Sequence, residues 1–197
     1  MENKYLVVPR ATCESWEYLP VRFTRKIHAG NYWSILPESQ LYQFGVLNSS
    51  MHMAWIKCVS GKLQCYDRFH HNPTIKNFPW PITHTQTQIM AIEERALMVQ
   101  SIRAQYPSTP LAELYNPLTM PVALRDAHIA LDKAVDAAYG QTRFASEDSR
   151  VGFLLNLKHR LTSLMVHFND DEPVLTEVPE VIGYAAGRTI RSSASIF

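Results

Sequence analysis

The chain has 197 residues, of which 46% are hydrophobic and 19% charged, and its formal net charge is +1 at pH 7. This composition is typical of a folded globular protein and excludes an intrinsically disordered chain. The apolar runs are too short to cross a membrane, and the N-terminus lacks the length and the cleavage site of a signal peptide. We therefore expect a cytoplasmic protein, without a membrane partner, whose three cysteines are reduced thiols.

Charge is distributed unevenly along the chain. Residues 1–85 carry nine lysine or arginine residues against five acidic ones, whereas residues 86–197 carry ten against thirteen. A basic first part indicates an anionic partner, of which nucleic acid is one candidate. Many domains without such a partner carry a similar excess, so the charge alone does not decide the function.

The first part of the chain predicts a β-rich unit. Its aromatic and β-branched runs are separated by turn residues, which is typical of short strands. Prolines within or next to these runs keep the strands short or place them at the edge of a sheet. The predicted strands lie at 5–8, 18–23 and 32–36.

Residues 41–60 predict one buried helix inside this β-rich unit. Apolar residues recur there at spacings of three and four, and Gly61 follows as a stop signal. After the helix, residues 62–69 alternate loosely between apolar and polar types. We expect them to form a further strand.

The predicted strand at 62–69 carries a set of polar side chains. Lys62, Gln64, Tyr66 and Arg68 occupy alternate positions, so in a single strand all four would share one face. Lysine and arginine can contact phosphates or guanine edges, glutamine can read adenine, and tyrosine can contact a phosphate or stack. A solvent-exposed strand face without a ligand is the alternative interpretation.

Two prolines bracket a tryptophan in the segment NFPWP, at 77–81, where neither a helix nor a central strand can form. We interpret Phe78 and Trp80 as a structural clasp that docks the second part of the chain onto the first. The prolines fix the extended conformation in advance, so little chain entropy is lost when the aromatic rings are buried. The alternative interpretation is a stacking platform for an unpaired base.

From residue 85 onward the pattern is helical. Pro107 ends a first long helix, Pro121 opens a second that Gly140 stops, and Ser146 is a good N-cap for a third. We therefore predict an α+β fold: a small mixed β-rich domain with one buried helix, followed by an antiparallel helical bundle. The expected divisions are 1–84, 85–168 and a tail without a strong pattern at 169–197.

Motifs that would indicate catalysis are missing from the sequence. It has no phosphate-binding glycine-rich loop and no GxSxG, CxxC or HExxH pattern. The Asn-Pro of YNPLTMP lacks the second proline and the aromatic of the NPP(Y/F) element with which amino-methyltransferases hold a flipped base. His70 and His71 beside Asp67 are the one arrangement that suggests a metal or hydrolase site, and a solvated turn is the simpler interpretation. We predict no catalytic residue and no metal site.

Several segments of the chain resemble the MmeI-like fused restriction–modification enzymes and related adenine-N6 methyltransferases of prokaryotes. The segments SSMHMAW, NFPWP, LYNPLTMP and LDKAVDAAYG occur in the same order and spacing as in that family. The resemblance covers roughly residues 3–165. Its first part is similar to the end of a DNA target-recognition domain, and its second part is similar to the C-terminal helical domain of the same enzymes.

The resemblance implies that this chain binds double-stranded DNA and positions it for an upstream methyltransferase catalytic domain. That domain would hold S-adenosylmethionine and the NPP(Y/F) element, so this chain would contain no cofactor site and would be inactive alone. In such enzymes the side chains after a Gly-basic-Leu turn reach the target bases, and here those are Lys62, Gln64, Tyr66 and Arg68. This chain reads CYDRFH where relatives often read SDYRYS, which leaves the DNA sequence undefined.

A non-catalytic protein-interaction module is the rival hypothesis, in which the amphipathic helices dock onto a partner domain or subunit. The position of the basic residues separates the two hypotheses. Clustering on one concave face favours DNA binding, whereas scattering favours the interaction module. The residues in question are Arg10, Lys57, Lys62, Arg68 and Lys76.

Overall fold

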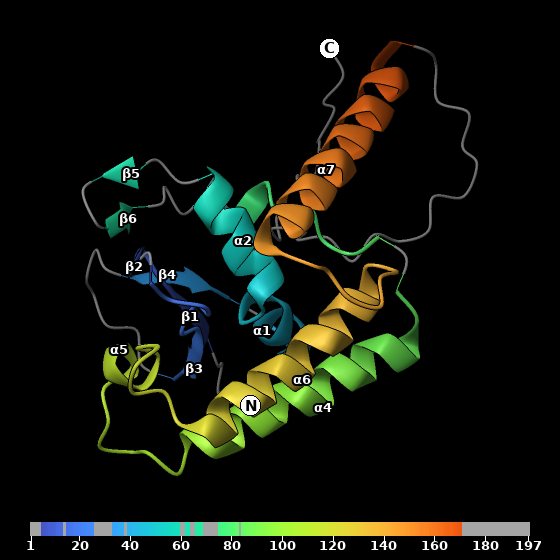
Figure 1. Ribbon diagram of the computed structural model, residues 1–197. Helices are drawn as coiled ribbons and strands as arrows, with labels where there is room; N and C mark the ends of the chain where they lie inside the picture. The colour runs from blue at the N-terminus through green and yellow to red at the C-terminus, as the bar shows by residue number, and fades with distance from the viewer. Residues whose placement is uncertain are drawn as a thin grey trace, which may run out of the picture.

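The strands lie on one side of the molecule and the long helices on the other (Figure 1). This arrangement confirms the predicted α+β class, with two small antiparallel sheets and a set of helices. The computed structural model describes residues 5–13, 15–25, 33–37, 39–59, 62–63, 66–68, 75–82 and 84–170.

Sheet A is antiparallel and has the strand order β3-β1-β4. Its central strand pairs Val7 with Arg22 on one side and with Ile35 on the other. Leu6 and Val8, which alternate with Val7, are fully buried in a core cluster with the first helix, so the opposite face of the sheet carries Arg22 and Ile35. The strands are β1 (Tyr5–Pro9), β3 (Arg22–Thr24) and β4 (Trp33–Leu36).

The strands predicted at 5–8 and 32–36 are present within one residue of the expected bounds. The strand predicted at 18–23 begins only at Arg22. Residues 18–21 are buried but irregular, because Pro20 has no backbone N–H to offer a sheet and Val21 N donates to Leu19 O at 2.8 Å in a tight local turn.

Sheet B continues from sheet A through the chain that leaves β1. It is antiparallel with the order β2-β6-β5, formed by β2 (Ala11–Cys13), β5 (Lys62–Leu63) and β6 (Tyr66–Arg68). Lys62 pairs with Asp67 and Leu63 with Tyr66, so the chain reverses between the two strands. The prediction of one strand over 62–69 is therefore wrong. A hairpin lets this short segment pair with itself and with β2, which satisfies backbone groups that a lone strand would leave open.

The predicted helix at 41–60 is interrupted after its second turn. It consists of α1 (Leu41–Leu47) and α2 (Ser50–Val59), which meet at Asn48 and Ser49. Asn48 Nδ2 donates to Phe44 O at 2.8 Å, and Ser49 Oγ donates to Val46 O at 2.6 Å. These local side-chain bonds occupy carbonyls that a continuous helix would use, which favours a break at this point.

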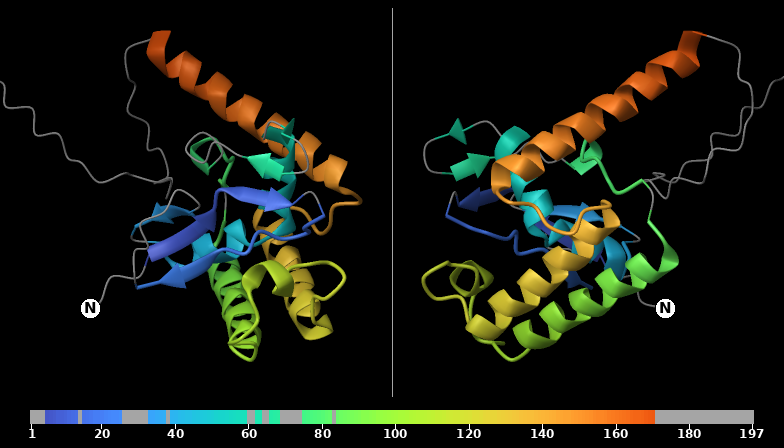
Figure 2. Two further views of the ribbon diagram at one scale, coloured as in Figure 1. Left: turned by 90° about the vertical axis from the view of Figure 1, so that its left-hand side faces the viewer. Right: turned by 45° about the vertical axis from the view of Figure 1, so that its right-hand side comes forward.

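Two long helices form the antiparallel pair at the base of the molecule, as both views of Figure 2 show. They are α4 (Gln86–Arg103) and α6 (Val122–Ala138), and the short helix α5 (Leu111–Leu114) lies in the connection between them. Gln88 Nε2, near the start of α4, donates to Ala137 O, near the end of α6, at 2.7 Å. The predicted stop at Gly140 is confirmed, since this residue has a φ of +74° that favours glycine.

The third predicted helix is α7 (Glu147–Asp170), and Ser146 caps it as expected by accepting from Ser149 N at 3.2 Å. It leaves the α4–α6 pair and packs mainly against α2 (Figure 1). The second part of the chain is thus an antiparallel pair with a helix that crosses onto the first part. Lys57 of α2 and Glu147 form an ion pair of 2.8 Å at this crossing.

The two parts of the chain share one hydrophobic core. A single cluster joins Tyr42 and Trp55 of the first part to Ile92 and Leu131 of the second. At the contact of α1 with α4, a Cβ on Gly45 would lie only 2.6 Å from Ile92 Cγ2, so the two backbones approach as closely as glycine allows. The first and second parts therefore behave as one folded unit.

The clasp formed by Phe78 and Trp80 lies at the junction, as predicted. Phe78 is 3% exposed, with its ring edge-to-face against Trp55 at 6.3 Å and against Trp80 at 5.3 Å. Trp80 packs against both hydrophobic clusters, and Tyr139 of the second part donates a hydrogen bond to Pro79 O at 2.9 Å. The clasp therefore holds the two parts together by burial and by a hydrogen bond to the backbone.

Arg103, in the last turn of α4, connects four segments around the junction. Its guanidinium donates to Val21 O at 2.5 Å, to Asn48 Oδ1 at 2.6 Å and to the hydroxyl oxygen of Tyr115. Tyr115 in turn bonds His128 Nε2 of α6 at 2.8 Å. Burial and the charge of Arg103 lower the pKa of His128 well below its ordinary value, so the neutral ring accepts the hydrogen bond of the tyrosine hydroxyl.

Asp132 of α6 forms a second polar link across the junction. Its carboxylate accepts from Ser50 N at 2.8 Å and from the Tyr18 hydroxyl at 3.1 Å. Burial raises the pKa of Asp132 to about 6, and the two hydrogen bonds oppose this rise only in part. Burial and the Asp132 charge also raise the pKa of Tyr18, which keeps its hydroxyl a donor.

The clasp predicts a large loss of stability in Phe78→Ala. We expect the free energy of unfolding to fall by about 3–5 kcal/mol, because a buried aromatic side chain leaves a cavity. Urea unfolding of this variant and of Ile82→Ala, whose side chain is 43% exposed in the same segment, would measure the difference. A Phe78 that stacks on a base instead would show little change in stability and a loss of DNA binding.

The raised pKa of Asp132 predicts a pH-dependent penalty on folding. A carboxyl group with a native pKa near 6 and an ordinary value of 3.8 favours the folded state below pH 4. That contribution is lost as pH rises from about 4 to 6. Relative to Asp132→Asn, the native chain should lose about 1 kcal/mol of unfolding free energy between about pH 5 and pH 7.5.

Urea unfolding at the two pH values measures this effect, with Asp126→Asn as the matched control because Asp126 is exposed on the same helix. The control should follow the native chain at both pH values. If the unfolding free energies of Asp132→Asn and of the native chain changed equally between the two pH values, the result would contradict a raised pKa of Asp132 in the folded chain.

Candidate nucleic-acid interface

The joint between the two sheets brings two of the predicted basic residues together. Arg10 is exposed and directly follows β1, and the next residue, Ala11, pairs with Arg68 of β6. Paired residues of an antiparallel ladder have Cα atoms about 4.5–5.5 Å apart. The β1–β2 ribbon therefore places the backbone of Arg68 next to that of Arg10.

The remaining residues of the predicted reading strand lie in or beside the hairpin. Lys62 and Tyr66 belong to β5 and β6, and Lys62 is paired with Asp67. Because the chain reverses between these strands, the four residues do not occupy alternate positions of one strand. Gln64 lies outside the described residues, as do His70 and His71.

The other two predicted cations lie outside the hairpin. The side chain of Lys57, in the last turn of α2, is 24% exposed and forms the ion pair with Glu147. Exposed ion pairs of this kind contribute little free energy, so a phosphate could replace the carboxylate at small cost. Lys76 is exposed two residues before the clasp. The structure thus groups Arg10 with Arg68 and sets Lys57 in a structural contact.

An exposed arginine that the sequence reasoning did not select lies on the outer face of sheet A. The guanidinium carbon of Arg22 is 5.0 Å from the centre of the Trp33 ring. Val7 pairs with Arg22 and Pro9 with Trp33, so the arginine reaches across the central strand to the tryptophan. The sequence predicted a strand at 18–23 without selecting Arg22, and only the strand pairing shows that Arg22 meets Trp33.

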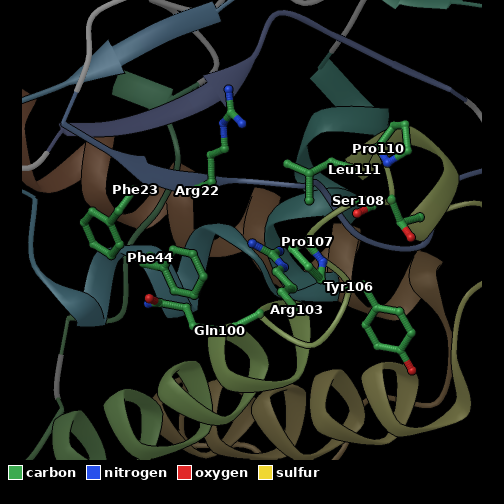
Figure 3. A pocket seen from close by; sticks show the side chains of 12 residues that line it. Arg22, Phe23, Phe44, Gln100, Arg103, Tyr106, Pro107, Ser108, Pro110 and Leu111 are labelled. Carbon is green, nitrogen blue, oxygen red and sulfur yellow. The ribbon is translucent and has the colours of Figure 1, made fainter.

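An open hollow of about 550 Å³ lies beside β3, the end of α4 and the connection that follows it (Figure 3). Two arginines take part in its lining, and no carboxylate does. Figure 3 shows Arg103 directed inward and Arg22 directed away from it, toward the strands. The lining residues are Arg22, Phe23, Phe44, Gln100, Arg103, Ala104, Tyr106, Pro107, Ser108, Thr109, Pro110 and Leu111.

A metal site and a membrane-spanning helix are both absent from the described residues. Among them, no three histidine, cysteine or acidic side chains lie close enough together to hold a metal ion. No helix in the described ranges combines the length and the apolar character needed to cross a bilayer. The hollow beside β3 is lined by guanidinium groups, hydroxyls and aromatic rings, which suits an anionic ligand.

Comparisons with known proteins identify both parts of the chain. Residues 1–82 match the family described as MmeI, target recognition domain, and residues 84–166 match the family described as MmeI, C-terminal domain. DNA methyltransferase A of Bacillus subtilis (strain 168) is 35% identical over 161 residues, which are 81% of this chain and 18% of that protein.

A solved structure extends the similarity to three dimensions. The type IIL restriction-modification enzyme MmeI, in complex with DNA, matches with a TM-score of 0.77 and 35% identity over 83% of this chain and 22% of that one. This chain thus spans about a fifth of the length of these two relatives. The two family matches meet directly after the clasp, and together they bear out the resemblance seen in the sequence. The chain belongs to the MmeI family and contains its target recognition domain and its C-terminal domain.

Proposed function

We propose that this chain is the DNA target-recognition and C-terminal helical part of a DNA adenine-N6 methyltransferase or fused restriction–modification enzyme. It binds duplex DNA and positions it for a catalytic domain encoded upstream, in a cytoplasmic, prokaryotic enzyme. The observation that carries this proposal is the likeness, at 35% identity, to an enzyme solved in complex with DNA. The basic joint of Arg10 and Arg68 supports it.

The proposed roles divide the basic residues into two groups. Lys62, Gln64, Tyr66 and Arg68, on and beside the β5–β6 hairpin, contact base edges in the major groove. A two-stranded ribbon fits that groove, so the observed hairpin suits this role better than the single strand expected from the sequence. Arg10, Lys57 and Lys76 contact phosphates and set the register of the duplex, with Lys57 exchanging Glu147 for a phosphate.

Methyl transfer itself belongs to the upstream domain in this proposal. The chain's seven glycines are dispersed, and no glycine-rich loop follows a strand in the described residues to cradle S-adenosylmethionine. The residues present do not fit the cofactor, and no step of the reaction is assigned to them. Isolated from the catalytic domain, the chain binds DNA without turnover.

A protein-docking role has one observation in its favour. The outer faces of α4 and α6 expose large apolar side chains, among them Met90 at 60%, Leu97 at 55% and Val122 at 73%. Such a surface suits contact with another domain. Docking through these helices and DNA binding through the sheets use different faces, so the two roles are compatible in one enzyme (Figure 2).

The DNA-binding proposal predicts a specific response to salt. On duplex DNA, the Lys62→Ala/Arg68→Ala double variant should bind more weakly than the native chain. Its plot of log K against log salt concentration should be shallower by up to about two, because the two cations that read base edges also neutralise the phosphates beside the groove, and each phosphate left unneutralised keeps its counterions. Fluorescence anisotropy titrations between about 50 and 200 mM salt measure both quantities.

The matched control is Lys133→Ala/Arg143→Ala, which removes two exposed cations from the second part of the chain. It should bind as the native chain does. Equal affinities and slopes for the two double variants would refute the assignment of the hairpin to DNA. Absence of binding by the well-folded native chain at low salt would refute the proposed function of this chain.

A further inference from the structure

Arg22 is an exposed guanidinium that is held in place by an aromatic ring. It lies on the outer face of sheet A, 5.0 Å from the centre of the half-buried Trp33 ring. The left view of Figure 2 shows the strands of this sheet in front of the helices. Stacking on tryptophan restricts the arginine rotamers before any ligand arrives, which lowers the entropy cost of binding.

The guanidinium of Arg22 keeps its hydrogen-bonding capacity. Within the described part of the chain it makes the contact to Trp33 and no hydrogen bond or ion pair. A guanidinium carries five N–H donors in a planar fork that matches phosphate oxygens. Arg103, the nearby arginine at the end of α4, uses its donors on Val21, Asn48 and Tyr115, whereas the fork of Arg22 is open.

The surroundings of Arg22 suit an anion. Its neighbours across the ladder on the outer face of sheet A are Val7, Ile35 and Trp33, none of which carries a charge. An anion at Arg22 therefore meets no negative charge from these neighbours.

The strand register connects Arg22 to the predicted DNA-binding residues. Arg22 pairs with Val7, and Ala11, four residues further along the same ribbon, pairs with Arg68. Four residues of extended chain span at most about 13 Å. B-DNA rises about 3.4 Å per base pair, so this stretch spans at most about four base pairs. Arg22, Arg10 and Arg68 thus follow one ribbon at a spacing that suits successive contacts with one duplex.

We propose that Arg22, held on Trp33, binds a phosphate of the duplex DNA backbone at the outer face of sheet A. This inference rests on the proposed function, since it assumes that the chain binds duplex DNA. It adds a contact outside the reading hairpin: Arg22 fixes the position of the duplex, while the residues of the hairpin read its bases.

The test is a set of anisotropy titrations of the full 197-residue chain on several duplexes of unrelated sequence. Arg22→Ala should weaken binding to every duplex by a similar factor and reduce the salt slope by about one. Arg22→Lys should keep the slope, because the charge remains. Trp33→Leu should weaken binding with the slope unchanged, because it removes the ring but leaves the charge. Arg143→Ala is the matched control for the loss of one exposed arginine and should leave both quantities unchanged.

The outcomes separate this inference from the proposed function. Binding by Arg22→Ala that equals that of Arg143→Ala, while Lys62→Ala/Arg68→Ala is impaired, overturns the Arg22 contact and leaves the proposed function intact. A loss confined to some duplex sequences overturns the phosphate assignment in favour of base reading. Absence of binding by the native chain overturns both. Thermal unfolding of each variant checks that a variant with weaker DNA binding is still folded.

Discussion

The position of sheet A relative to the helices depends on the guanidinium of Arg103. From the end of α4 it bonds the backbone just before β3, the break between α1 and α2, and the tyrosine that reaches α6. The planar fork of arginine supplies these bonds in directions that a lysine ammonium cannot reproduce together. Removing it would leave Asn48 Oδ1 and Val21 O without this donor, at a cost of about 1–3 kcal/mol for each group that stays buried and unsatisfied.

Contacts across the boundary between the two matched families explain why they form one folded unit here. The core cluster, the Phe78–Trp80 clasp and the Asp132 link all cross the boundary between the recognition and C-terminal parts. A DNA-reading surface must hold its side chains at fixed positions, and rigid elements do so better than loops. In the proposed function, the helical part would serve recognition by fixing the orientation of the sheets, while its exposed apolar side chains would face a neighbouring domain.

The features that were predictable from the sequence are those set by local signals. Pro107, Gly140 and Ser146 mark the ends of helices through backbone geometry and capping, and the apolar stripes give the buried faces of α4 and α6. The clasp was predictable because two prolines leave few conformations to a segment with two large rings. Each of these inferences needs only a few neighbouring residues.

The features that were missed depend on residues distant in the sequence. The break at Asn48 and Ser49 reflects side-chain bonds that compete with the helix, and Asn48 also accepts from Arg103, 55 residues away. The hairpin at 62–68 is fixed by its pairing with β2, about 55 residues earlier. Arg22 meets Trp33 only through the register of β1. For the candidate site, the residue types were therefore predictable from the sequence, whereas the residues that come together in space were not.

Hydrogen–deuterium exchange of the full chain, with and without duplex DNA, tests most directly whether the two sheets form a DNA-binding surface. Such a surface predicts slower exchange on DNA binding in residues 5–13, 22–25 and 62–68, and no change on the outer faces of α4 and α6. Protection confined to α4 and α6, or no protection anywhere at low salt, would contradict a DNA-binding surface formed by the two sheets.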